Sequence, residues 1–292
     1  MEKRPFSPTE NLPTNFGEVK VEKFSYDSQS GPIQGIRVRA EKIKDPQAVL
    51  YGPGWGATIM THLSPIKQLA QRGYDVISIT PPSTTNRKKD GFPSIEYAKG
   101  EAQVQALQKQ FVTRASLVGH SEGCINVSIA ALIALNHNIK IDSLVLVAPG
   151  GLIGKDRTGI LIPRFFFNAA VEPRLTGEKG DRANAKLRRS EAIKTIVTNP
   201  ILAFKEAQAI ANTSLSDILK ELHRRGVKIA VVQGDNDLVF PLEKMIPEAE
   251  KCGVDTFYEG PKGRGGHNGI VTQPESYTTQ IVDALKRLSP KK

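Results

Sequence analysis

Short apolar segments alternate with amphipathic segments along most of the chain, and this alternation predicts a β/α architecture. Segments 19–26 and 33–40 alternate apolar and polar residues with a period of two, which is typical of an antiparallel hairpin. Further strands are predicted at 48–52, 75–80, 115–119, 143–148, 227–233 and 254–258, and helices at 61–71, 95–111, 122–136, 242–251 and 275–288. This order predicts a mainly parallel sheet with helices on both faces, in which ligands bind beyond the carboxyl ends of the strands.

Two intervals break this rhythm. Residues 1–16 are rich in Pro, Thr and Asn, which predicts an irregular lead-in. No strand pattern occurs over 151–225, so we expect a helical cap there, inserted after the sixth strand. The α/β core is then formed by residues 17–150 and 226–292.

The segment Gly119-His120-Ser121-Glu122-Gly123 carries the strongest chemical signal, because it reads G-x-S-x-G between a predicted strand and a predicted helix. The two glycines let strand and helix approach closely, and the tight turn lifts the serine hydroxyl into the open. Free N–H groups at the start of the helix point toward an oxyanion formed there. Such strings also occur by chance, but the flanking elements favour a nucleophilic serine.

A serine hydroxyl needs a base, and the base needs a group that orients it. After an elbow of this type the acid and then the base follow the serine in sequence. Of the five histidines, His267 lies last, in a glycine-rich loop after the strand predicted at 254–258. His120 lies inside the elbow, and its side chain is expected to point away from Ser121. We therefore predict that His267 is the base, with a solvated loop residue as the alternative.

The acid is expected in the loop Gly234–Pro241, which follows the strand predicted at 227–233. Asp237 is predicted to orient His267, because it lies farther past the strand end, where the loop can turn its carboxylate back. Asp235 is predicted to bond nearby backbone N–H groups as a turn residue. A simple turn is the alternative role for both aspartates.

Acyl transfer also needs donors aimed at the developing oxyanion. One is expected to be the backbone N–H of Glu122, and the second the N–H of Trp55 in the loop after the third strand. Pro53 in the same loop has no N–H and cannot serve. The Trp55 ring would wall the pocket, with ordinary core packing as the alternative.

Together these motifs resemble the α/β-hydrolase superfamily, and in architecture the resemblance spans residues 17–290. Pro53-Gly54-Trp55-Gly56 is similar to the His-Gly-Trp-Gly oxyanion segment of many members, with Pro53 where that histidine usually stands. The resemblance implies an α/β-hydrolase fold with a cap. It also implies a serine hydrolase that cleaves carboxylic esters through an acyl-enzyme, with neither cofactor nor metal.

Two alternatives stay open at the level of function. The same triad could cleave amide, thioester, lactone or activated carbon–carbon bonds, because specificity lies in the cap and the pocket. A non-catalytic ligand-binding member of the fold is the second alternative. It would have no need of three catalytic residues.

The cap interval is apolar at 160–167 and strongly charged farther on, with helical stretches predicted at 182–197 and 201–225. Phe165 and Phe166 are expected to line an acyl pocket, with packing of the cap onto the core as the alternative. The contrast predicts a lid whose apolar side covers the acyl group while its charged side faces water. A solvated basic face is expected from Arg182, Lys186, Arg188 and Arg189.

Composition narrows the remaining possibilities. The 292 residues suffice for one large α/β domain with an insertion, and two cysteines predict reduced thiols. A formal net charge of +10 raises nucleic acid, an anionic substrate or a membrane surface as partners, but no aromatic residues interleave the short basic runs, which disfavours nucleic acid. With neither a signal peptide nor a membrane-spanning stretch evident, we expect a cytoplasmic protein that acts on a small acyl substrate. The sequence leaves the oligomeric state and the acyl chain length open.

Overall fold

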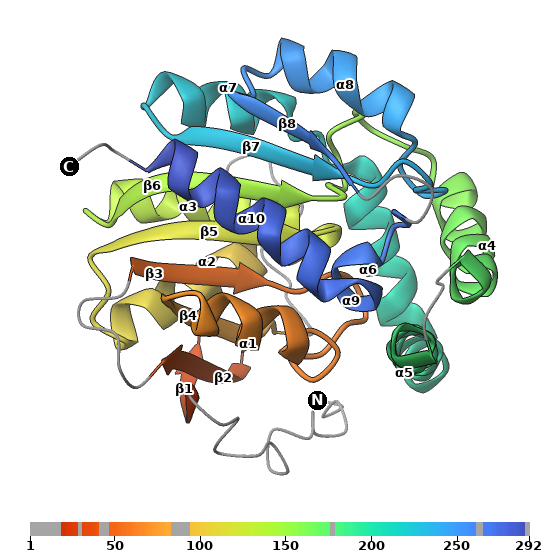
Figure 1. The fold of residues 1–292 in the computed structure, drawn as a ribbon, viewed down its shortest axis with the longest axis horizontal. Coiled ribbons are helices and arrows are strands. Elements are labelled where there is room, and N and C mark those ends of the chain that lie inside the picture. Colours follow the sequence, from red (N-terminus) through yellow and green to blue (C-terminus); the bar gives the residue numbers. More distant parts are fainter. Residues whose placement is uncertain are drawn as a thin grey trace.

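The computed structural model describes residues 19–28, 31–40, 47–82, 94–175, 179–260 and 265–289 (Figure 1). Eight strands in this part of the chain form one sheet in the order β1-β2-β4-β3-β5-β6-β7-β8. They are β1 (Val19–Ser28), β2 (Gly31–Ala40), β3 (Gln47–Gly52), β4 (Tyr74–Thr80), β5 (Arg114–His120), β6 (Lys140–Val147), β7 (Lys228–Gln233) and β8 (Thr256–Glu259). The predicted lead-in, residues 1–16, lies outside the described residues.

Strand directions follow from the connections between them. The hairpin β1–β2 is antiparallel, with Val19 opposite Ala40, and β2 also runs antiparallel to β4. The pairs from β4 through β3 to β8 are all parallel. Each strand overlaps one predicted from the sequence, with bounds that differ by up to three residues, and the predicted mainly parallel sheet is confirmed.

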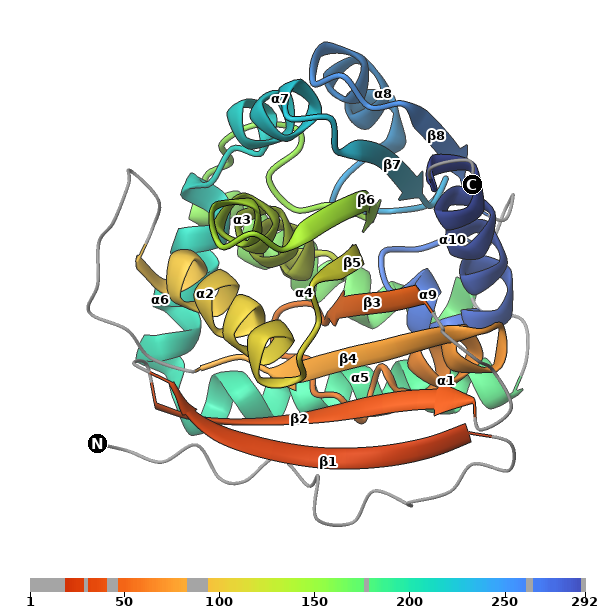
Figure 2. The same ribbon diagram turned by 90° about the vertical axis from the view of Figure 1, so that its left-hand side faces the viewer.

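Ten helices are described. They are α1 (Leu63–Gln71), α2 (Ser94–Lys109), α3 (Glu122–Asn136), α4 (Thr158–Leu175), α5 (Lys179–Thr198), α6 (Pro200–Asn212), α7 (Ser216–Arg224), α8 (Leu242–Lys251), α9 (Gly269–Thr272) and α10 (Pro274–Leu288). Figure 2 shows α1 and α10 on one side of the sheet and α2, α3 and α7 on the other. Both faces of the parallel strands are therefore covered, which explains their continuous runs of buried β-branched and aliphatic residues.

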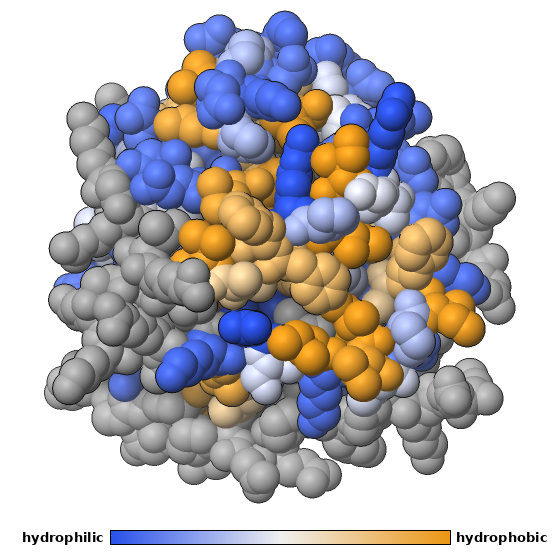
Figure 3. Space-filling model, turned by 90° about the vertical axis from the view of Figure 1, so that its right-hand side faces the viewer, coloured by the Kyte–Doolittle hydropathy of each residue, from blue (hydrophilic) through white to orange (hydrophobic). Residues whose placement is uncertain are grey.

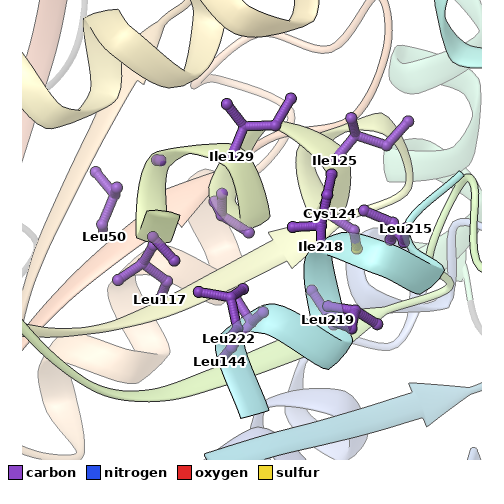
Figure 4. Close-up of a cluster of buried hydrophobic side chains, with 14 of the residues drawn as sticks. Leu50, Leu117, Cys124, Ile125, Ile129, Leu144, Leu215, Ile218, Leu219 and Leu222 are labelled. Atoms are coloured by element: carbon purple, nitrogen blue, oxygen red, sulfur yellow. The ribbon is translucent and has the colours of Figure 1, made fainter. Parts of the chain in front are cut away.

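A separate hydrophobic core lies on each side of the sheet. One is shared by α1, α10 and the strand residues that face them. In the other, Leu215, Ile218, Leu219 and Leu222 of the α7 region pack against α3 and the strands (Figure 4). Both cysteines are buried free thiols.

The interval between β6 and β7 contains α4 to α7. Figure 1 shows α4, α5 and α6 beyond the carboxyl ends of the parallel strands, whereas α7 packs back onto the core. The expectation of one helical stretch over 201–225 is wrong. Thr213 is extended after α6, and its hydroxyl donates to the carbonyl of Ala209, so the chain turns before α7 begins. None of the helices in the described residues is long and apolar enough to cross a membrane.

The turn from β5 into α3 requires both of its glycines. A Cβ at Gly119 would lie 2.7 Å from the backbone nitrogen of Cys124. A Cβ at Gly123 would overlap the carbonyl oxygens of Gly52 and Pro53, the latter at 2.6 Å. The close approach predicted from the two glycines is thus a contact between backbone segments. A clash with an added Cβ could not be relieved by a change of side-chain rotamer.

Gly123→Ala should therefore lower the free energy of unfolding by about 1–3 kcal/mol, because the added methyl forces α3 away from the end of β3. The matched control is Gly159→Ala in α4, where an added Cβ meets nothing within 4 Å and the helix should gain up to about 1 kcal/mol. Urea unfolding measures both variants. Equal stabilities for the two would contradict this explanation of the turn.

Candidate active site

Ser121 occupies a strained backbone position. Its φ of 55° and ψ of −120° lie in a region that residues with a side chain rarely adopt. Three backbone hydrogen bonds hold it there: its N–H donates to the carbonyl of Val147 at 2.9 Å, and its carbonyl accepts from Cys124 at 3.0 Å and Gly150 at 3.1 Å. The neighbouring strand and the helix start therefore impose the conformation that presents the serine side chain.

The structure brings Ser121, Asp237 and His267 together from the loops after β5, β7 and β8. The His267 Nε2 lies 2.9 Å from the Ser121 Oγ, and the Nδ1 lies 2.9 Å from the Asp237 Oδ2. All three residues are buried, so little water competes for these hydrogen bonds. The arrangement can pass a proton from the serine hydroxyl to an imidazole whose opposite nitrogen is held by a carboxylate.

The Asp237 carboxylate is fixed on both oxygens. Its Oδ1 accepts from the backbone N–H groups of Val239 at 2.8 Å and Phe240 at 2.9 Å. Its Oδ2 accepts from Gln233 Nε2 at 3.0 Å in addition to facing His267. Asp235 points elsewhere, since its Oδ1 accepts from the backbone N–H of Gly265 at 3.2 Å. Asp235 thereby joins the acid loop to the start of the histidine loop.

Two further histidines form a buried row behind His267. The His120 Nε2 lies 2.9 Å from the carbonyl oxygen of His267, so this nitrogen carries the proton and donates. The His62 ring lies 5.1 Å from that of His120, and the His62 Nδ1 lies 2.7 Å from the Tyr51 hydroxyl. Burial lowers the pKa of His62 to about 3 and holds the pKa of His120 well below its usual value. Both rings are therefore neutral near pH 7 and add no positive charge beside His267.

The loop after β3 lies directly against the serine. A Cβ at Gly54 would stand 3.1 Å from the Ser121 Cβ, so the backbone that leads to Trp55 borders the elbow. The Trp55 ring packs against that of Phe165, with centroids 5.0 Å apart. Glu122 is the first residue of α3, so no earlier residue of the helix accepts from its backbone N–H.

A buried network links the side chains of Trp55 and Glu122. The indole Nε1 of Trp55 donates to Glu206 Oε2 at 3.1 Å. The Glu206 Oε1 lies 3.2 Å from the Lys99 ammonium, which also donates to Glu122. Although burial alone would favour the neutral amine, the carboxylates of Glu122 and Glu206 raise the pKa of Lys99. The cation therefore persists, and it connects the two segments from which oxyanion donors were predicted.

Helices α4 to α6 reach the catalytic loops through charged side chains. Glu172 accepts from the backbone N–H of Asn268, next to His267, at 2.7 Å. Arg188 donates to the carbonyl oxygens of Trp55 and, at 3.3 Å, Gly56. Together with Glu206, these residues place buried charge on the inner side of the helices.

Two expectations for this interval are corrected by the structure. Lys186 and Arg189 are exposed as expected, but Arg188 is buried, because its position on α5 faces the loop after β3. The expected lid, apolar inside and charged outside, is found only in part, because some apolar side chains also face outward and some charged ones face inward. Phe165 is only 7% exposed, but Phe166 is 43% exposed, and several apolar neighbours also face outward. The side chain of Arg182 lies outside the described residues.

Sequence reasoning missed Lys99, Glu172 and Glu206, and it did not predict the contacts that His120 and Arg188 make at the site. One signal was present: Glu96, Lys99 and Gln103 recur at helical spacing, so they share one side of α2, and that side is buried. The other contacts join helices that are far apart in sequence. No local pattern marks them.

Solved structures with this fold are numerous. A hydrolase from Pseudomonas aeruginosa matches with a TM-score of 0.67 over 93% of this chain and 99% of its own, at 17% identity. A thermophilic esterase from Thermogutta terrifontis matches with a TM-score of 0.63 over 93% of this chain and 100% of its own, at 16% identity. An enol-lactonase from Burkholderia xenovorans matches with a TM-score of 0.68 over 90% of this chain and 99% of its own, at 14% identity.

No protein-family model matches the chain, and no curated protein matches it in sequence. The structural matches nevertheless cover nearly the whole chain and nearly the whole of each matched protein. The chain has the α/β-hydrolase fold, as the resemblance of its motifs implied. At these identities the match defines the fold, and the activity must be argued from the site.

The buried glutamate Glu96 gives a testable pH dependence of stability. Burial, reinforced by the neighbouring Glu122 carboxylate, holds the pKa of Glu96 well above its usual value. In the unfolded chain the Glu96 carboxyl loses its proton near pH 4.5, whereas in the folded chain the carboxyl keeps the proton to higher pH. Folding therefore becomes less favourable as the pH rises above 4.5. Glu96→Gln removes this penalty.

Glu96→Gln should be more stable than the parent at pH 8, and the difference should shrink as the pH falls toward 4.5. Urea unfolding at several pH values measures it. Glu243→Gln, at an exposed position of α8, is the matched control, because it removes no buried charge. A Glu96→Gln variant that is destabilised equally at all pH values would refute the argument.

Proposed function

We propose that the protein is a serine hydrolase that cleaves carboxylic esters through an acyl-enzyme. The observation that carries the proposal is the hydrogen-bonded row from Ser121 through His267 to Asp237 on a strained elbow. Strain in the backbone and burial of hydrogen-bonded polar side chains both cost stability, and both are expected where a nucleophile is prepared. Matched structures named as a hydrolase, an esterase and an enol-lactonase support hydrolysis as the class of reaction.

In the proposed first half-reaction, the His267 Nε2 accepts the hydroxyl proton as the Ser121 Oγ attacks the ester carbonyl. The imidazolium that forms is stabilised by the Asp237 carboxylate at Nδ1. The proton then passes from Nε2 to the leaving alcohol oxygen as the carbon–oxygen bond breaks. Water, deprotonated in the same way, releases the acid and restores the serine.

The backbone N–H groups of Trp55 and Glu122 are proposed as the oxyanion donors. Two observations support them: the Gly54 backbone borders Ser121, and Glu122 begins α3. Their side chains are tied to Glu206 and Lys99, which limits the freedom of both segments. Preorganised donors of this kind lower the barrier because they need not reorient as charge develops.

Helices α4 to α6 are proposed to act as a cap, with Phe165 in the substrate pocket. The contact of Phe165 with the Trp55 ring supports this role. Phe166 was predicted from sequence to share it, and its greater exposure favours Phe165 as the residue nearer the acyl group. Lactones are cyclic esters that the same steps would open, so they belong among the substrates tested.

Labelling by a fluorophosphonate tests the nucleophile. The parent should be labelled and should release a burst of p-nitrophenol from p-nitrophenyl esters. Ser121→Ala should do neither, because the variant lacks the Oγ that lies 2.9 Å from the His267 Nε2. Ser128→Ala, in the helix that follows the elbow and with its hydroxyl bonded to the carbonyl of Cys124, is the control and should react like the parent. Retention of intact ester by an unlabelled parent would instead indicate a ligand-binding protein.

The choice of acid gives a second test. Asp237→Asn should reduce kcat by roughly 10³–10⁴-fold, because an amide at this position favours the wrong imidazole tautomer. Asp235→Asn should reduce it far less, since that side chain bonds Gly265. Ester turnover by both variants, with circular dichroism to check folding, decides between them. A larger loss in Asp235→Asn would show that the acid was wrongly assigned.

A further inference from the structure

The outer surface of α4, α5 and α6 is unusually apolar. Ten large hydrophobic side chains are exposed in the described residues, and eight of them lie on these three helices. We call this set the cap face: Ile160, Phe166, Phe167, Leu187, Ile193, Val197, Ile201 and Phe204. Val197 and Ile201 are each 72% exposed, which is far from the burial that core packing produces.

The cap face is also contiguous. The three helices pack against one another, and Figure 3, which views the side of the molecule where they lie, shows hydrophobic side chains grouped across that side. A shallow pocket lined by Ile201, Phe204 and Lys205 lies within it. Scattered exposed apolar residues are ordinary, but a grouped set of this extent marks an interaction surface.

The exposed charges that the structure describes on α4 to α6 are cationic. Lys186, Arg189 and Lys194 on α5 and Lys205 on α6 are exposed. The carboxylates that the structure describes on these helices are turned inward: Glu172 and Glu206 are buried, and Glu191 is bonded to the Thr58 hydroxyl. Among the side chains that the structure describes on α4 to α6, the outward surface is therefore apolar and cationic.

We propose that the cap face docks on an anionic lipid surface. Apolar side chains beside lysine and arginine are the pattern by which helices lie in a membrane interface, where the former enter the acyl boundary and the latter meet the headgroups. Docking of this kind needs no spanning helix. The net charge of +10 adds long-range attraction to the same surface.

Other occupants fit the surface less well. In a symmetric pair of this chain, each cap face would meet its own copy, and lysines and arginines of like sign would be brought together. A nucleic acid would satisfy the basic side chains but leave eight large apolar ones against water or phosphate. An anionic lipid surface satisfies both kinds of side chain at once.

The placement of the cap face sets the orientation of the docked protein. Its outer residues lie on the helices whose inner residues contact the loops at Trp55 and Asn268. Docking through the cap face would therefore bring the candidate active site toward the lipid. The docking proposal depends on the residues of the cap face and not on the proposed esterase activity. Its test measures binding to vesicles and needs no substrate turnover.

Cosedimentation of the full chain with vesicles tests the proposal. The protein should bind vesicles that contain phosphatidylglycerol, bind pure phosphatidylcholine vesicles far less, and be released by high salt. The triple variant Val197→Ser, Ile201→Ser, Phe204→Ser and the double variant Lys194→Glu, Lys205→Glu should each weaken binding by at least about tenfold. All five positions are exposed, so folding, checked by circular dichroism, should persist.

Matched controls lie at the amino ends of the central strands β5 and β6, whereas the cap helices lie beyond the carboxyl ends. Phe111→Ser removes an apolar side chain that is 92% exposed after α2, and Lys140→Glu reverses an exposed charge at the start of β6. Both controls should bind like the parent. The proposal is overturned if the parent does not bind anionic vesicles, or if the controls lose as much binding as the cap-face variants. Dimers in analytical ultracentrifugation that the triple variant abolishes, without vesicle binding, would assign the face to a second copy instead.

Discussion

The tight approach of three backbone segments, at the ends of β3 and β5 and the start of α3, is the constraint on which the candidate site depends. Gly123 lets α3 start against the carbonyls of Gly52 and Pro53, and this approach sets the backbone of Ser121 at a positive φ. The same approach brings the loop after β3 against the serine. The positions of the nucleophile and of the proposed oxyanion donors thus both follow from this close approach. It occurs where β3 and β5 lie side by side and the helices that follow them cover opposite faces of the sheet.

Burial gives the site its second organising feature. His62 and His120 are held neutral, so the hydrogen bond from His120 can position the His267 backbone without opposing a positive charge on that ring. In contrast, Lys99 stays charged, because surrounding carboxylates outweigh the cost of removing it from water. The histidines are neutral and Lys99 is charged, but both groups connect segments that follow different strands through buried contacts.

The cap helices combine two surfaces that a sequence pattern would not assign to one segment. Their inner side contacts the catalytic loops through Glu172, Arg188 and Glu206, and these charges are tolerated because each is hydrogen-bonded. Leu161, Phe165 and Ile210 add apolar contacts on the same inner side. Eight other large apolar residues of these helices nevertheless lie outside.

The sequence by itself determined the order of elements, the parallel sheet and the loops that carry Ser121, Asp237 and His267, because these follow from local periodicity and from turn chemistry at strand ends. It could not determine which side of a cap helix faces the site. Lys186 and Arg188 belong to one basic run, and Phe165 and Phe166 to one apolar run, yet the members of each pair differ in burial. Only the tertiary structure decided this, since burial depends on the surface that packs against each side of a helix, and here that surface comes from segments distant in the chain.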